Sequence, residues 1–214
     1  MGVFDDLLTF VKSLSVRYHE KINALLKVFK EADEETSRLM HSSGLKCEQG
    51  CGRCCESPYI EATVFEMLPV AFDVWRRNEA SPLLEKLAHS DVAVSDRCVF
   101  YRPDPFVAGH GRCSVYHFRP LVCRLFGFSA AVNKHNRNIL MTCNTIKRNF
   151  PEKYEQTHID VHSGQMPIAR MRDFSMKALA IDLDFGDKKF PINQALKIAL
   201  EKVGLMLSYQ GEKI

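Results

Sequence analysis

Apolar residues recur at steps of three and four along the first thirty positions of the chain. They are Phe4, Leu7, Val11, Leu14, Tyr18, Ile22, Leu25 and Phe29. Charged residues such as Lys12 and Glu20 fall on the opposite face, and this spacing is typical of an amphipathic helix. We expect one long helix that continues in polar form beyond Glu31 and ends near Gly44. A coiled coil that forms a dimer is the alternative use of this stripe.

The C-terminal region repeats the helical spacing. Its apolar stripe consists of Leu196, Leu200, Val203 and Leu207, and Pro191 with Asn193 marks the start of the helix. Neither terminal helix can bury its stripe alone, so we expect the two helices to pack together. The same stripes could instead bind a protein partner or form a homodimer.

The middle of the chain carries recognisable helix-start signals. Thr63 and Glu66 have the spacing of a capping box, which predicts a helix start there. Pro69 lies one turn further and should kink or restart that helix. Ser81 followed by Pro82 predicts a short helix that ends at about Ala88.

Two short β-prone runs, 98–101 and 113–116, flank a segment rich in proline and glycine. This arrangement predicts a small hairpin with a long loop. Pro120 is expected at the first position of the next helix. After Asn144 the chain should be largely irregular until the C-terminal helix begins, with a short turn of helix at 152–156 as the alternative.

The predicted fold is therefore mainly α, with helices flanking an irregular cysteine-rich centre and a small β-hairpin. We expect a single domain over residues 1–214. It comprises an N-terminal amphipathic helix (1–45), a cysteine-cluster core (46–150), and a C-terminal irregular segment and helix (151–214).

Composition narrows the functional classes. The net charge of the 214 residues is only +3, which gives no indication of nucleic-acid binding. The N-terminus lacks the basic and apolar regions of a secretory signal. No apolar run approaches the length of a membrane span. These features predict a cytoplasmic protein that does not cross a membrane.

The most informative chemistry is the clustering of eight cysteines. All of them fall within one stretch: Cys47, Cys51, Cys54, Cys55, Cys98, Cys113, Cys123 and Cys143. Disulfides rarely persist in a reducing compartment, so clustered thiols there favour metal binding. An exported protein held by disulfides is the weaker alternative, because the chain has no signal sequence.

The spacing of Cys51 and Cys54 lets two sulfurs from one tight turn reach one metal. Gly52 is expected to permit that turn through a positive φ. Cys54 and Cys55 are adjacent, and neighbouring side chains tend to diverge. We therefore predict that these two do not both bind the same ion in a simple tetrahedral site.

Cys123 is predicted to lie in the first turn of the helix after Pro120, where free N–H groups and the helix dipole lower a thiol pKa. Four thiolates around a divalent metal leave a net negative charge. Arg119 and Arg124 are the arginines that we expect to offset it from outside the ligand set.

At these residues the chain resembles the YkgJ-type cysteine-cluster family (CxxCxxCC), whose domain is described as zinc- or iron-chelating. The pieces that carry the resemblance are 51–55, Thr63 with Glu66, 98–100, 111–116, Arg119-Pro120, 123–126 and Cys143. The resemblance implies metal chelation and covers under half of the chain. A relative, the flagellin lysine-N-methylase, has a similar cluster and uses S-adenosylmethionine.

We therefore predict a cytosolic protein that chelates an iron–sulfur cluster or zinc through its eight cysteines. Its role would be structural, redox or metal handling. An iron–sulfur cluster is slightly favoured over Zn²⁺, because all the ligand candidates are cysteines and arginines surround them. The alternative is a methyltransferase-like enzyme in which the cluster is a structural support. Catalytic residues cannot be assigned.

Overall fold

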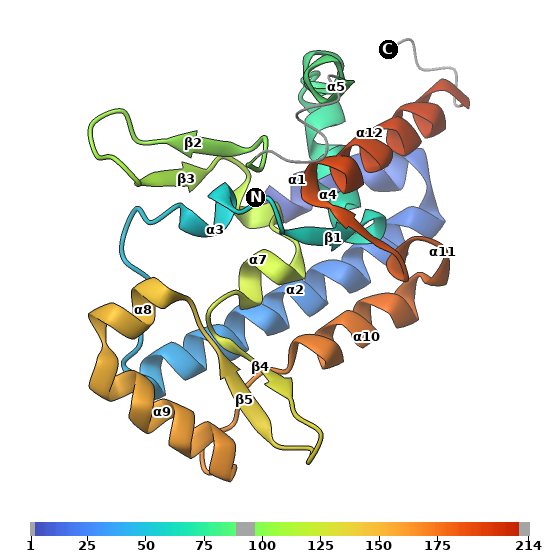
Figure 1. The fold of residues 1–214 in the computed structure, drawn as a ribbon. Coiled ribbons are helices and arrows are strands. Elements are labelled where there is room, and N and C mark those ends of the chain that lie inside the picture. The colour runs from blue at the N-terminus through green and yellow to red at the C-terminus, as the bar shows by residue number, and fades with distance from the viewer. Residues whose placement is uncertain (1–2, 89–96, 210–214) are drawn as a thin grey trace.

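The computed structural model describes residues 3–88 and 97–209, and the fold is mainly helical (Figure 1). Helices surround a centre of loops and short strands that carries the cysteines, as the sequence predicted. In the described ranges, none of the helices is both long and apolar enough to span a membrane.

The N-terminal segment forms two helices, α1 (Val3–Leu14) and α2 (Val16–Ser43), where one was expected. Ser15 separates them because its backbone is extended and its side chain accepts a hydrogen bond from the Tyr18 amide at 3.3 Å. The end of α2 is close to the prediction: Gly44 has a φ of 66° and donates its N–H to the Met40 carbonyl.

The main hydrophobic core is built around α4 (Val64–Arg76), whose residues 64–74 are all buried. The predicted capping box is confirmed, because Thr63 and Glu66 each accept a hydrogen bond from the other's backbone N–H. Pro69 lies inside α4, which neither ends nor restarts there. The prediction of a restart was wrong.

The C-terminal helix α12 (Ile192–Tyr209) begins where the sequence predicted, and its whole apolar stripe is buried. α12 packs mainly against α4, whereas α1 packs against both α2 and α4, so the terminal helices bury their stripes mainly on these helices rather than on each other. The short helix α5 (Ala80–Ala88) also packs on α12 and starts one residue before the expected serine cap.

A second, smaller hydrophobic cluster lies at the other end of α2. Its buried members are Leu39, Leu45, Phe128, Leu140, Ile146 and Val161. They come from the end of α2, the hairpin of β4 (Ser129–Val132) and β5 (Asn138–Met141), and the helices α8 (Asn144–Asn149) and α9 (Pro151–Ser163).

The segment after Asn144 was expected to be irregular, and this was wrong. Cys143 caps α8 with its sulfur, and Pro151 occupies the first turn of α9. The sequence of α9 shows no clear apolar stripe, since the helix is mostly exposed and buries only Thr157 and Val161. Two further helices, α10 (Met171–Ile181) and α11 (Leu183–Gly186), complete this region.

Short antiparallel pairs connect the helices to the centre. β1 (Glu61–Thr63) pairs with β6 (Lys189–Pro191), and no pattern in the sequence indicated that pair. The predicted cysteine hairpin exists as β2 (Tyr101–Pro103) and β3 (Gly111–Cys113), with Tyr101 opposite Cys113. The first strand starts three residues after the start of the predicted run 98–101. The second strand ends three residues before the end of the predicted run 113–116.

Candidate metal centre

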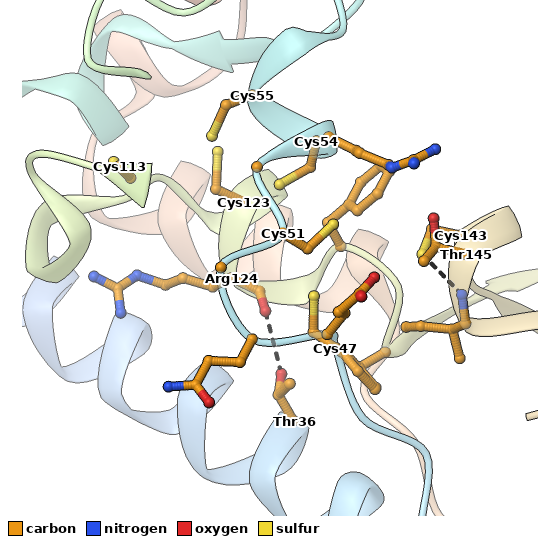
Figure 2. A pocket seen from close by; sticks show the side chains of 18 of the residues that line it. Thr36, Cys47, Cys51, Cys54, Cys55, Cys113, Cys123, Arg124, Cys143 and Thr145 are labelled. Atoms are coloured by element: carbon orange, nitrogen blue, oxygen red, sulfur yellow. Dashed lines mark hydrogen bonds between the residues drawn. The ribbon is translucent and has the colours of Figure 1, made fainter. Parts of the chain in front are cut away.

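A cavity of about 1100 Å³ lies where the main core and the second cluster meet. One wall comes from β3 and the helices α3 (Arg53–Glu56) and α7 (Leu121–Leu125), and another comes from α2 and α8. Seven cysteines line it: Cys47, Cys51, Cys54, Cys55, Cys113, Cys123 and Cys143 (Figure 2). The tertiary structure thus gathers thiols that are up to 96 positions apart in sequence, since 143 − 47 = 96.

The loop that carries the first four cysteines is held by backbone hydrogen bonds to its neighbours. The Gly111 amide donates to the Gly50 carbonyl at 2.8 Å, and Cys51 forms a β-bridge with His110. The Cys98 amide donates to the Cys55 carbonyl at 3.1 Å. These bonds bring Cys98, which does not line the cavity, next to the short helix α3.

Tyr101 explains why glycine occupies two positions of this centre. A Cβ atom at Gly52 would lie 2.2 Å from the Tyr101 ring, and one at Gly111 would lie 2.3 Å from it. The φ of Gly52 is −106°, so the expectation of a positive φ was wrong. The glycine is needed because an aromatic ring occupies the space of its side chain. Tyr101 also donates its hydroxyl to the His110 carbonyl at 3.1 Å.

Helix α7 presents Cys123 from its first turn, although Pro120 is the N-cap rather than the first helical residue. The Glu66 carboxylate, which is buried, accepts a hydrogen bond from the Leu121 amide at 3.0 Å. The capping box of α4 is thereby joined to the start of the helix that carries Cys123.

The pKa of Cys123 differs from the sequence prediction. Burial raises the pKa of this thiol well above its usual range, and the neighbouring thiolates of Cys98 and Cys54 raise it further. The expected lowering by the helix dipole was wrong, because a helix of five residues has only a small dipole and desolvation of a buried thiolate outweighs it.

Arg124 and Arg119 occupy different environments. The buried Arg124 guanidinium bonds to the Asp33 carboxylate and to the carbonyls of His117 and Arg119, and it lies over the Phe29 ring. Figure 2 shows its side chain directed away from the thiols. Arg119 lies 3.5 Å above the Tyr116 ring centroid, and its charge favours the thiolates of Cys54, Cys113 and Cys123.

Five thiols lie close enough to change one another's pKa: Cys54, Cys55, Cys98, Cys113 and Cys123. The neighbouring Cys55 thiol, acting as a donor, lowers the pKa of Cys54 to about 6, and Arg119 lowers it further. The same contact, together with burial, raises the pKa of Cys55. Burial raises the pKa of Cys98 to about 11 and also raises the pKa of Cys113. Cys54 and Cys55 therefore face one cavity, although adjacent side chains were expected to diverge.

Cys47, Cys51 and Cys143 form a second group beside the first. Burial raises the pKa of Cys47 to about 11, and the charges of Cys51, Cys143 and Cys54 add to this. Cys143 accepts a hydrogen bond from the Ile146 amide at 3.4 Å, so it is fixed to the start of α8. This group therefore connects the cysteine loop to the second hydrophobic cluster.

The donor chemistry of the cavity fits a thiophilic metal. All eight cysteines are free thiols, and thiolate sulfur is the ligand that zinc and iron–sulfur clusters prefer. Among the described residues, no set of three His, Cys, Asp or Glu side chains already surrounds a single point at metal-binding distance. The thiols instead are distributed over the cavity wall (Figure 2).

Residues 46–147 match a family model, CxxCxxCC, described as a "putative zinc- or iron-chelating domain". The matched range is 102 of the 214 residues, just under half of the chain. No curated protein and no solved structure matched the chain. The family match supports metal binding and leaves open which metal or cluster is bound.

All eight cysteines fall inside the matched range, which begins just before Cys47 and ends just after Cys143. The structure adds residues to the centre that the sequence reasoning missed. Tyr101 is recognisable only from its contacts with the two glycines. Phe126, Lys147 and Arg148 line the cavity, and their positions near Cys123 and Cys143 were the only signal in the sequence.

Proposed function

We propose that the CxxCxxCC domain of this protein binds an iron–sulfur cluster or zinc through its eight cysteines, in a structural, redox or metal-handling role. The observation that carries the proposal is the convergence of seven thiols on one cavity, with Cys98 interacting electrostatically with four of them. Free thiols gathered in this way suit a thiophilic metal that ties together segments with few contacts of their own.

The thiols fall into two groups, and this supports two neighbouring sites. The first would use Cys54, Cys55, Cys98, Cys113 and Cys123, of which four suffice for a tetrahedral set. The second would use Cys47, Cys51 and Cys143. Arg119, whose charge already favours three thiolates of the first group, would offset the negative charge of the occupied site. Arg124 would act indirectly, by fixing α7.

An iron–sulfur cluster remains slightly favoured over zinc. Cysteine is the whole ligand set, and the thiols surround a volume larger than one ion needs. When bound, a cluster would supply one-electron chemistry, whereas zinc would supply cross-linking of the loops. The methyltransferase-like alternative remains a hypothesis that rests on the resemblance to a relative.

The test is elemental analysis of protein purified without oxygen. An iron–sulfur cluster predicts iron, acid-labile sulfide and a brown colour with absorbance near ~400 nm. Stoichiometric zinc in a colourless protein would select the other metal, and the absence of both would refute the proposal. Cys123→Ala and Cys54→Ala should lose metal and reduce the stability of the fold by several kcal/mol, roughly the contribution of a structural metal.

The matched control is Ser114→Ala, next to Cys113, which removes a partly buried hydrogen bond to the Phe100 carbonyl but no thiol. It should keep its full metal content. The two-group arrangement makes a further distinction: Cys143→Ser should reduce the metal content without emptying the site of Cys123. Equal loss of all metal in both variants would show a single shared centre.

A further inference from the structure

The cavity is much larger than a metal centre requires. A zinc–sulfur bond of about 2.3 Å defines a sphere of roughly 50 Å³ around the ion. The cavity encloses about 1100 Å³. Pockets for small organic ligands typically enclose about 300–1,000 Å³ and often lie where two packed units meet. With two zinc ions bound, roughly 100 Å³ by the same estimate, most of this cavity remains for another occupant.

One part of the wall is apolar and carries no thiol. It is formed by Met40 from α2, Phe126 and Phe128 after α7, and Ile146 from α8. Phe128 and Ile146 are buried in the second cluster, so the half-buried Met40 and the exposed Phe126 present this surface to the cavity. Phe126 is 41% exposed, which is unusual for a phenylalanine that has a hydrophobic cluster beside it. An apolar surface of this kind is stabilised when the body of an organic ligand covers it.

The charged part of the wall is predominantly cationic. It contains Arg53, Arg112, Arg119, Arg124, Lys147 and Arg148, against the carboxylates of Asp33 and Glu48. Asp33 is bound to Arg124, so its charge is already compensated. Within residues 3–88 and 97–209, no ion pair holds Arg53, Arg112 or Arg148.

The cations also lie on more than one wall. Arg53 and Arg119 lie beside the thiols of the first group, where they can offset a metal–thiolate centre. Lys147 and Arg148 come from α8, next to Ile146. The Lys147 ammonium lies 5.0 Å from the centroid of the Tyr154 ring on α9, which leaves Arg148 as the exposed cation of this wall. The positive charge on α8 therefore accompanies the apolar surface.

We infer that the cavity binds a small organic anion, with its apolar body on Phe126 and Met40 and its acidic group at Arg148. This inference rests on the proposed function in one respect: the metal occupies the part of the cavity that the thiols line, and the anion occupies the rest. The ligand class is a carboxylate or a similar anion on an aromatic or aliphatic body, bound beside the metal centre.

The experiment is equilibrium dialysis of the metal-loaded full-length protein against 2-naphthoate and its neutral amide, 2-naphthamide. These probes have nearly the same shape and differ by one charge. Naphthoate should bind saturably at one site and roughly tenfold more tightly than the amide, which corresponds to about 1.4 kcal/mol. Arg148→Glu should weaken naphthoate about tenfold and change the amide less than about twofold. Phe126→Ala should weaken both.

The matched control is Lys134→Glu, the same reversal of charge at an exposed position in the turn between β4 and β5. It should leave both affinities unchanged. Equal binding of the two probes, no saturable binding, or an unaltered naphthoate affinity in Arg148→Glu would overturn the inference. Metal analysis of the same samples separates the two proposals: full metal content without naphthoate binding refutes only this one.

Discussion

At the scale of single residues, the centre depends on close approach between an aromatic ring and two glycines. Tyr101 is 5% exposed and fills the space where side chains at Gly52 and Gly111 would lie. This contact fixes the loop of Cys51 and Cys54 against the hairpin that carries Cys113. The sequence indicates a tight turn at Gly52, but the reason for the glycine is visible only in the packing.

Gly52→Ala should therefore destabilise the protein and displace the cysteine loop. The expected loss is about 1–3 kcal/mol, the usual cost of overpacking, because the new methyl group meets a ring that is itself buried. Urea unfolding measures the loss, and metal content reports the displaced loop. In the double variant Gly52→Ala/Tyr101→Leu, the combined loss should be smaller than the sum of the single losses. Strict additivity would mean that the ring is not the obstacle.

At the scale of elements, two buried side chains orient the five-residue helix α7, which is too short to be stable by itself. Glu66 accepts the Leu121 amide at its start, and Arg124 ties it to Asp33 on α2. Both contacts join α7 to long helices of the main core. Cys123 consequently has a fixed position before any metal binds.

Glu66→Ala should lower the free energy of unfolding by roughly 2 kcal/mol, since it leaves the amides of Thr63 and Leu121 without their acceptor. Glu66→Gln keeps a side-chain oxygen and should cost clearly less. Thermal unfolding measures both variants. Thr63→Ala is the control, because it removes the hydroxyl half of the capping box and leaves the contact with α7. A loss in Glu66→Ala no larger than in Thr63→Ala would show that the contact with α7 contributes little.

At the scale of the whole molecule, α2 extends from the main core to the second cluster, and the cavity lies beside it. Cys143 is the N-cap of α8 and packs on the second cluster, whereas Cys98, Cys113 and Cys123 pack on the main core. A metal bound by the second group of thiols would connect the two regions across the cavity.

Removal of the metal by a chelator should therefore loosen this junction. Amide hydrogen exchange should increase in residues 47–55 and in α8, because both lose a shared ligand, while α4 and α12 should stay protected by the core. Cys143→Ser should reproduce the increase in α8 without chelator. Unchanged exchange in α8 after complete metal removal would exclude a metal that joins the two regions.

The sequence by itself determined the mainly helical class, the capping box at Thr63, the C-terminal helix and the cysteine set of the candidate centre. These depend on local spacing and on residue chemistry, which the chain displays directly. Only the tertiary structure decided the break at Ser15, the helices after Asn144, the use of Gly52 and the pKa of Cys123. The use of Gly52 and the pKa of Cys123 depend on packing or desolvation by residues distant in sequence, and that information is absent from any local pattern. The caps at Ser15 and Cys143 are local contacts, but the apolar spacing continues through Ser15 and is weak in α9, so this spacing alone does not reveal them.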